Sequence, residues 1–204
     1  MMRKLVLPLL LISAGGVMLL AVIVKLWPVF YPDIAISLKL QAKGETVLPV
    51  VMNLISLPGH PTMIIVGTVT VAMIFFLLSY RREAGFMLLT FLGEGVNFLL
   101  KVVVNRPRPD GSLVKVQQQF TDSSFPSGHV VHYVVFFGFF LVTMFTMKRL
   151  PLPVRIMGGL TSLALIFLIS ISRVYLGAHW ATDVIGGYLV GAGVLTALVY
   201  AYLR

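Results

Sequence analysis

A polar stretch separates two long apolar runs near the end of the chain: Ser172-Arg173-Val174-Tyr175-Leu176-Gly177-Ala178-His179-Trp180-Ala181-Thr182-Asp183. His179 and Asp183 are four residues apart, so they share one face of a helix that begins here. An aspartate that accepts the proton of one imidazole nitrogen leaves the other nitrogen bare, free to attack an electrophile or bind a metal. Arg173 adds a planar guanidinium suited to phosphate. Taken alone, the stretch is equally consistent with a buried His–Asp pair that only fixes a helix start.

The composition around this stretch is that of a membrane protein. Of the 204 residues, 58% are hydrophobic and 11% are charged, whereas roughly 25% are charged in an ordinary soluble domain. The net charge of +9 comes from bases at the ends of apolar runs, which indicates anionic lipid head groups rather than nucleic acid. The chain has no cysteine, so it forms no disulfide or thiolate metal site. We expect one membrane-embedded domain over residues 1–204, with no obligate protein partner.

Six apolar segments approach the roughly 20 residues that a membrane-spanning helix needs. They cover about residues 5–26, 62–80, 84–104, 128–147, 154–171 and 183–202. The first resembles the start of a signal peptide, but it is too long for one and no clear cleavage site follows, so we expect a retained span. Residues 46–57 repeat apolar side chains at helical spacing and predict a helix on the membrane surface. The predicted fold is all-α, with six transmembrane helices and a short interfacial helix.

The distribution of basic residues predicts the orientation. Eight of the sixteen fall on each side of the membrane if the spans alternate. Four on one side lie in polar segments suspected of binding a ligand: Lys101, Arg106, Arg108 and Arg173. Discounting these four places both termini in the cytoplasm and the polar segments outside, because basic residues are enriched in cytoplasmic loops.

Alternating spans bring three polar clusters to one face of the membrane. The segment Lys101–Pro109 ends with Arg108 between two prolines, and Pro126-Ser127-Gly128-His129 begins an apolar run. A hydroxyl and a glycine amide at a helix start form a natural anion site, and His129 lies where it can donate a proton. Each cluster alone has an ordinary explanation, as membrane-anchoring bases or as helix capping. Together with the opening stretch they supply three cations and two histidines, which suits phosphoryl transfer.

Few carboxylates are available near these clusters for a metal site. Apart from Asp183, only Asp110 and Asp122 lie nearby in the sequence. A metal triad of histidine and aspartate is therefore the less favoured alternative, and we predict a site without metal.

Three complete motifs now identify a family resemblance. Lys101 to Pro109 matches K-x6-R-P, Pro126 to His129 matches P-S-G-H, and Ser172 to Asp183 matches S-R-x5-H-x3-D. Over about residues 60–200 the chain resembles the type 2 phosphatidic acid phosphatase (PAP2) superfamily, and within it the bacterial phosphatidylglycerophosphatase B branch. The resemblance implies a metal-independent lipid phosphatase of the cell membrane that uses a phosphohistidine intermediate and no cofactor.

The resemblance also implies a role for each motif residue. His179 would be the nucleophile, with Asp183 as its orienting partner, and His129 would protonate the departing lipid alkoxide and then help to activate water. The phosphate oxygens would be held by a further set: Lys101, Arg108, Ser127, Gly128 and Arg173. The expected reaction is hydrolysis of phosphatidylglycerol phosphate to phosphatidylglycerol. Alternative substrates are undecaprenyl diphosphate, phosphatidate and diacylglycerol pyrophosphate; a lipid binder without turnover is disfavoured, because no motif is degraded.

Four residues outside the motifs remain to be explained. Glu94 lies seven residues before Lys101, on the same helix face and roughly 10 Å deeper. It either forms a hydrogen bond between helices or lines a lipid-entry cavity and selects the head group. We expect His132 to be structural, Arg106 to contact a head group, and His60 to be a loop histidine without a chemical role.

Overall fold

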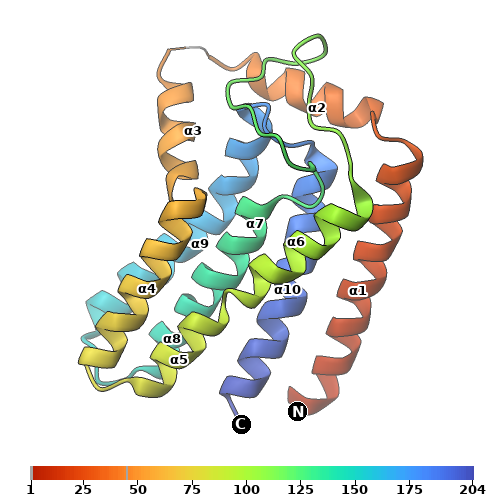
Figure 1. Ribbon diagram of the computed structural model, residues 1–204. Coiled ribbons are helices and arrows are strands. Elements are labelled where there is room, and N and C mark those ends of the chain that lie inside the picture. Colours follow the sequence, from red (N-terminus) through yellow and green to blue (C-terminus); the bar gives the residue numbers. More distant parts are fainter. Residues whose placement is uncertain (1, 45) are drawn as a thin grey trace.

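The computed structural model describes residues 2–44 and 46–204, with side chains from residue 5 onward. Within these ranges the chain forms helices and no strands, which confirms the all-α prediction (Figure 1). Two of the sixteen basic residues counted for the orientation, Arg3 and Lys4, lie outside the described side chains. The two termini lie at one end of the helical bundle, and the long loop 105–127 lies at the other (Figure 1). The alternation of the spans is therefore as expected.

Within residues 2–44 and 46–204, five helical segments are long and apolar enough to cross a membrane. They are Leu5–Leu26, Arg81–Val104, Gly128–Thr146, Leu152–Tyr175 and Ala181–Tyr202. The first belongs to α1 (Met2–Leu26), and the last two are α9 (Leu152–Tyr175) and α10 (Ala181–Tyr202). The second comprises α5 (Arg81–Leu89) and α6 (Leu92–Val104). Apart from Gly128–Thr146, which is largely enclosed, these segments expose many large apolar side chains, as helices surrounded by lipid tails must.

A sixth candidate span consists of two helices that meet at a bend. It combines α3 (Leu48–Ser56) and the 3-10 turn η1 (Leu57–Gly59) with α4 (Pro61–Leu77), which meet at 59°. The helix that we expected to lie on the membrane surface at 46–57 therefore continues into α4, as Figure 1 shows. The helix α3 packs on α9, where Ser172 Oγ of α9 donates a hydrogen bond to the Met52 carbonyl of α3 at 2.7 Å. This packing makes it part of the bundle.

A helix that the sequence did not predict, α2 (Tyr31–Gln41), lies across the loop end of the bundle (Figure 1). Its buried face is polar and carries Asp33, Ser37 and Gln41. A sequence reveals a helix on the membrane surface by an apolar stripe along the face that the helix buries. The helix α2 buries a polar face instead, so its sequence lacks this signal. The short helix outside the spans is therefore α2.

The most enclosed span runs through α7 (Gly128–His132), the π-helical turn η2 (Tyr133–Phe137) and α8 (Gly138–Thr146). Glycines allow α10 to pack closely against it. A Cβ at Gly187 would lie 2.8 Å from Val130 Cβ, and one at Gly191 would lie 2.6 Å from Val134 Cβ. This close approach holds the starts of α7 and α10 side by side, and both starts carry motif residues.

Candidate active site

The three motif clusters meet at the loop end of the bundle. Arg108 Nη1 lies 3.3 Å from His179 Nε2, which joins the first cluster to the third. The Ser127 amide donates to the Asp183 carbonyl at 3.0 Å, which joins the second to the third. The site therefore forms where α6 and α9 end and α7 and α10 begin.

His179 presents a bare nitrogen to this site. Its Nδ1 lies 2.8 Å from the Ser124 carbonyl oxygen. A carbonyl only accepts, so Nδ1 carries the proton and Nε2 is left to accept from Arg108. Burial lowers the pKa of His179 well below 6.5, and the positive charges of Arg108, Lys101 and Arg173 lower it further. The imidazole is therefore neutral near pH 7, and its unprotonated Nε2 accepts from Arg108.

Asp183 orients His179 less directly than the motif implies. Its Oδ2 lies 3.7 Å from His179 Nδ1, beyond hydrogen-bond reach. The carboxylate instead accepts from Ser124 Oγ, from the Trp180 amide at 2.9 Å and from Arg106 Nη1 at 2.6 Å. Ser124 thus joins the two, since its hydroxyl binds Asp183 and its carbonyl binds His179. No motif in the sequence marks Ser124.

Lys101 and Arg108 both pair with Asp122, which the sequence suggested only as a possible metal ligand. Asp122 lies 2.9 Å from Lys101 Nζ and 2.6 Å from Arg108 Nη2. Burial raises the pKa of Asp122, but hydrogen bonds and charge from Lys101 and Arg108 outweigh it and lower the pKa to about 2. Asp122 is therefore ionised and pairs with both cations.

Arg173 and Ser127 retain unused hydrogen-bonding capacity. Arg173 is fully buried, and its Nη1 donates to Ser56 Oγ at 2.8 Å and to Gln118 Oε1 at 2.9 Å. Its Nε and Nη2, and Ser127 Oγ, are buried without a partner among the described residues. Leaving buried donors unpaired is costly. Three such atoms at one end of the bundle indicate a site built for an anion.

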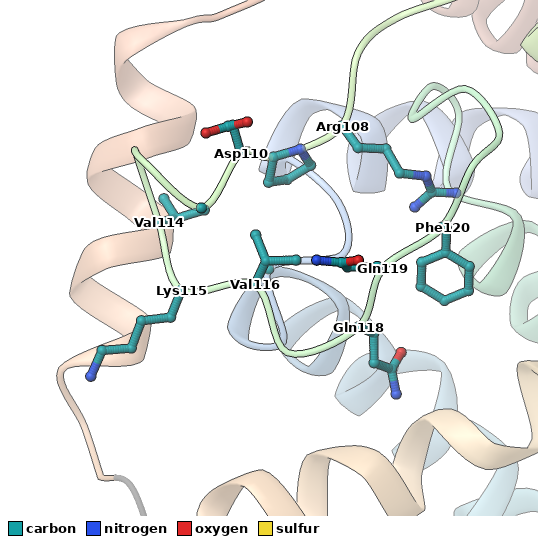
Figure 2. A pocket seen from close by; sticks show the side chains of 11 residues that line it. Arg108, Asp110, Val114, Lys115, Val116, Gln118, Gln119 and Phe120 are labelled. Carbon is teal, nitrogen blue, oxygen red and sulfur yellow. The ribbon is translucent and has the colours of Figure 1, made fainter.

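Phe120 lines two cavities at this site. The Phe120 ring centroid lies 4.5 Å from Arg108 Cζ and 5.5 Å from Arg173 Cζ, and it meets His129 edge-on at 6.3 Å. Figure 2 shows the Arg108 guanidinium directed toward this ring. The cavity of about 580 Å³ in that view is lined by residues of loop 105–127 and by Gly177.

The second cavity, of about 400 Å³, reaches the proposed acid. His129 lines it together with Phe120 and with residues of α3 and η1. His60 also lines it, although the sequence indicated only a loop histidine. This cavity connects His129 to the bent span, which the sequence placed outside the site.

Gly128 is closely packed against α6. A Cβ at Gly128 would lie 2.9 Å from Asn97 Nδ2, so any larger residue would displace Asn97. Asn97 shares its helix face with Lys101 and Glu94, at three- and four-residue spacing. This face of α6 therefore meets the start of α7 along its length.

Glu94 and His132 form a pair between α6 and α7. Glu94 Oε1 lies 3.3 Å from His132 Nδ1, and the His132 ring stacks on Phe136 with centroids 5.2 Å apart. The pair is consistent with an interhelical role for both residues. The role of Glu94 in a lipid-entry cavity stays a prediction.

Arg106 does not contact a head group, contrary to our expectation. Its side chain has an exposed fraction of 0% and binds two carboxylates, Asp33 and Asp183.

Residues 2–44 and 46–204 contain no group of three His, Cys, Asp or Glu side chains that could hold a metal ion. Independence from metal stays a prediction for assay.

The chain is similar in sequence to a known protein family and to two individual phosphatases. Residues 82–204 match the family described as the PAP2 superfamily. The chain is 34% identical over 140 residues to phosphatidylglycerophosphatase B of Bacillus subtilis (strain 168), covering 64% of this chain and 61% of that protein. It is 35% identical over 144 residues to human dolichyldiphosphatase 1, covering 64% and 56%. The chain thus aligns with less than two thirds of the length of either relative.

Two crystal structures share the fold. A transmembrane PAP2-type phosphatidylglycerolphosphate phosphatase from Bacillus subtilis superposes with a TM-score of 0.82 at 26% identity, over 94% of both chains. Aquifex aeolicus LpxE superposes with a TM-score of 0.61 at 20% identity, over 82% of this chain and 96% of that one. The second match shows the fold alone.

Proposed function

This chain belongs to the PAP2 superfamily, and we propose that it is an integral membrane lipid phosphatase that hydrolyses phosphatidylglycerol phosphate to phosphatidylglycerol and phosphate. One observation carries the proposal: the bare Nε2 of His179 faces a cationic site in which donors of Arg173 and Ser127 lack partners. A tetrahedral phosphate would satisfy these donors and bring its phosphorus to the nucleophile.

The proposed reaction has two steps. In the first, the Nε2 lone pair of His179 forms a bond to phosphorus while the bond from phosphorus to the lipid oxygen breaks, and His129 gives its proton to that oxygen. In the second, water attacks the phosphohistidine, His129 accepts the proton of the water, and the bond from nitrogen to phosphorus breaks. Lys101, Arg108 and Arg173 neutralise charge on the phosphoryl oxygens in both steps.

The surroundings of the site support a lipid substrate. His129 opens into a cavity bounded by α3 and η1, and α3 also exposes apolar side chains that do not line the cavity, as at Val50 and Leu54. A lipid head group at this level can enter the site while its acyl chains stay beside the spans. Phosphatidylglycerol phosphate is the first choice of substrate, because phosphatidylglycerophosphatase B is a relative at 34% identity.

A polyprenyl diphosphate is the second candidate substrate. It is favoured by the 35% identity to dolichyldiphosphatase 1, and undecaprenyl diphosphate is the corresponding bacterial lipid. Its terminal phosphate would occupy the same cationic site, and the leaving group would be a phosphate rather than an alkoxide. Such a leaving group needs less help from the acid His129.

We also propose that the active site faces outside the cell membrane and that both termini are cytoplasmic. Because the chain contains no cysteine, single cysteines can be introduced without background. In intact cells a membrane-impermeant maleimide should label Gln119→Cys, in the exposed loop, and should not label Arg204→Cys. The reverse pattern would contradict the orientation.

Phosphate release from a panel of purified lipid phosphates in detergent tests the function. We expect phosphatidylglycerol phosphate to be hydrolysed fastest, in the presence of EDTA and with inhibition by vanadate. His179→Ala should abolish turnover and the acid-labile phosphoprotein trapped from labelled substrate. Activity lost in EDTA and restored by Mg²⁺, or a near-normal rate in His179→Ala, would contradict the mechanism.

A further inference from the structure

A buried arginine outside the motifs lies between two buried carboxylates. Arg106 Nη2 donates to Asp33 Oδ2 at 2.8 Å, and Arg106 Nη1 donates to Asp183 Oδ1 at 2.6 Å. The exposed fractions of these three side chains are 0%, 1% and 0%. Arg106 Nε also donates to the Pro28 carbonyl at 3.0 Å. The arginine thus joins the segment before α2, α2 itself and the start of α10.

Asp33 also holds the first turn of α10. Its Oδ1 accepts from the Thr182 amide at 2.9 Å, and its Oδ2 accepts from Thr182 Oγ1 at 2.6 Å. The amides of a first helical turn have no partner within the helix, so Asp33 supplies from α2 an acceptor that α10 lacks. Thr182 directly precedes Asp183, and its position therefore sets where the Asp183 carboxylate lies.

The main chain of Arg106 supports the other side of the nucleophile. The Arg106 carbonyl accepts from the Ser124 amide at 2.9 Å, and the Arg106 amide donates to Ser123 Oγ at 3.0 Å. Ser124 in turn accepts the Nδ1 proton of His179. One residue thus fixes both groups that define the imidazole: Ser124 through its main chain and Asp183 through its guanidinium.

A role in anchoring α2 alone does not explain this arrangement. Burying three charges requires a large desolvation free energy, and well-packed apolar residues often serve stability equally well. An anchor would also have no need to bind Asp183, which belongs to the His179 motif. The contacts of Arg106 converge on the partners of the nucleophile instead.

We propose that Arg106 and Asp33 are positioning residues that hold the tautomer and orientation of His179 through Asp183 and Ser124. The inference rests on the proposed phosphatase function only for its kinetic consequence. It connects α2, the helix that the sequence did not predict, to the reacting histidine through Arg106, Asp183 and Ser124.

Loss of the Arg106 charge and loss of the Asp33 charge should change the pKa of His179 in opposite directions. The groups that act on the His179 imidazole are the cations Arg108, Lys101 and Arg173, together with His129 and the anion Asp183. Arg106 offsets the negative charge of Asp183. Removing the Arg106 charge should therefore raise the pKa of His179, and removing the Asp33 charge should lower it.

The experiment compares Arg106→Gln and Asp33→Asn with a control, Arg155→Gln, in the full-length protein. Arg155 donates to the carbonyls of Met144 and Phe145 at the far end of the bundle. Both test variants should lower kcat by about 10–100-fold, the loss typical when the hydrogen-bond partners that orient a metal-ligating histidine are removed, with KM nearly unchanged. The control should keep the wild-type kcat.

A second readout needs no turnover. The chain has four histidines, so the His179 imidazole can be titrated by NMR with the other three as internal references. Opposite shifts of its pKa in the two variants support the inference. Folded variants with wild-type kcat and an unchanged His179 titration overturn it.

The two proposals can fail separately. A wild-type protein that releases phosphate from no lipid would refute the proposed function, while the NMR titration would still decide the role of Arg106 and Asp33. If Arg106→Gln does not fold, Asp33→Asn decides the question. It is nearly isosteric and keeps an acceptor for the Thr182 amide, so an unchanged titration and kcat in that variant overturn the inference.

Discussion

The glycine beside the proposed acid offers a quantitative test of the site. Gly59, in η1, lies directly against the His129 ring: a Cβ there would lie 2.3 Å from Cδ2 and 2.8 Å from Cγ of the imidazole. Carbon atoms in contact are normally about 3.5 Å apart or more. Gly59→Ala must therefore displace the ring by about 1.2 Å. A misplacement of about 1 Å can reduce a rate about 10²-fold.

The expected loss is about 100-fold in kcat for phosphatidylglycerol phosphate, measured as phosphate release. The first turnover of p-nitrophenyl phosphate should be largely spared, because its leaving group needs no acid. Gly67→Ala in α4 is the matched control, since no atom lies within 4 Å of its Cβ. If folded Gly59→Ala turns over the lipid at the Gly67→Ala rate, the inferred position and role of His129 are wrong.

Three further predictions follow from particular residues. Asp122→Asn removes the carboxylate that competes with phosphate for Lys101 and Arg108, so vanadate should inhibit about two- to fivefold more tightly. The expected change is small because the Asp122 carboxylate is exposed to solvent. Unchanged or weaker inhibition would contradict this prediction. The folded-state pKa of His179 lies well below 6.5, so its nucleophilic form persists as pH falls to that value, and the acid limb of kcat/KM should lie below pH 6.5. An acid limb above pH 6.5 in the pH–rate profile would count against a neutral nucleophile. In the unfolded chain the same imidazole takes up its proton near pH 6.5, so the stability that neutral His179 contributes is complete above that pH and declines below it. Glu94→Gln preserves the hydrogen-bonding shape opposite His132, so thermal stability and the ranking of lipid phosphates should be unchanged, whereas a changed ranking at equal stability would show the cavity role.

The residues of the candidate site were predictable where chemistry is encoded locally. Lys101, Arg108, His129 and His179 lie in short motifs with fixed spacing, and the ends of apolar runs place these motifs at one face. The spans themselves follow from composition, because a helix in lipid must be apolar over its whole length. Neither inference needs knowledge of a distant contact.

The partners of those residues were not predictable, because they come from distant segments. Asp33 lies on a helix whose buried face is polar, and Arg106, Ser124 and Asp122 look like ordinary loop residues. Each contact joins positions many residues apart, as the pairing of Arg106 with Asp33 shows. No periodicity or spacing encodes such a pair.

The sequence alone determined that this protein is a bundle of membrane-spanning helices with a cationic, two-histidine cluster at one end. Hydropathy and motif spacing are properties of neighbouring residues, so they survive in the unfolded chain. Tertiary structure decided that His179 donates to Ser124 rather than to Asp183, that Arg106 is buried, and that α3 joins α4. Hydrogen bonds of this kind depend on distances and angles of a few tenths of an ångström and a few degrees, and only the packed helices set these.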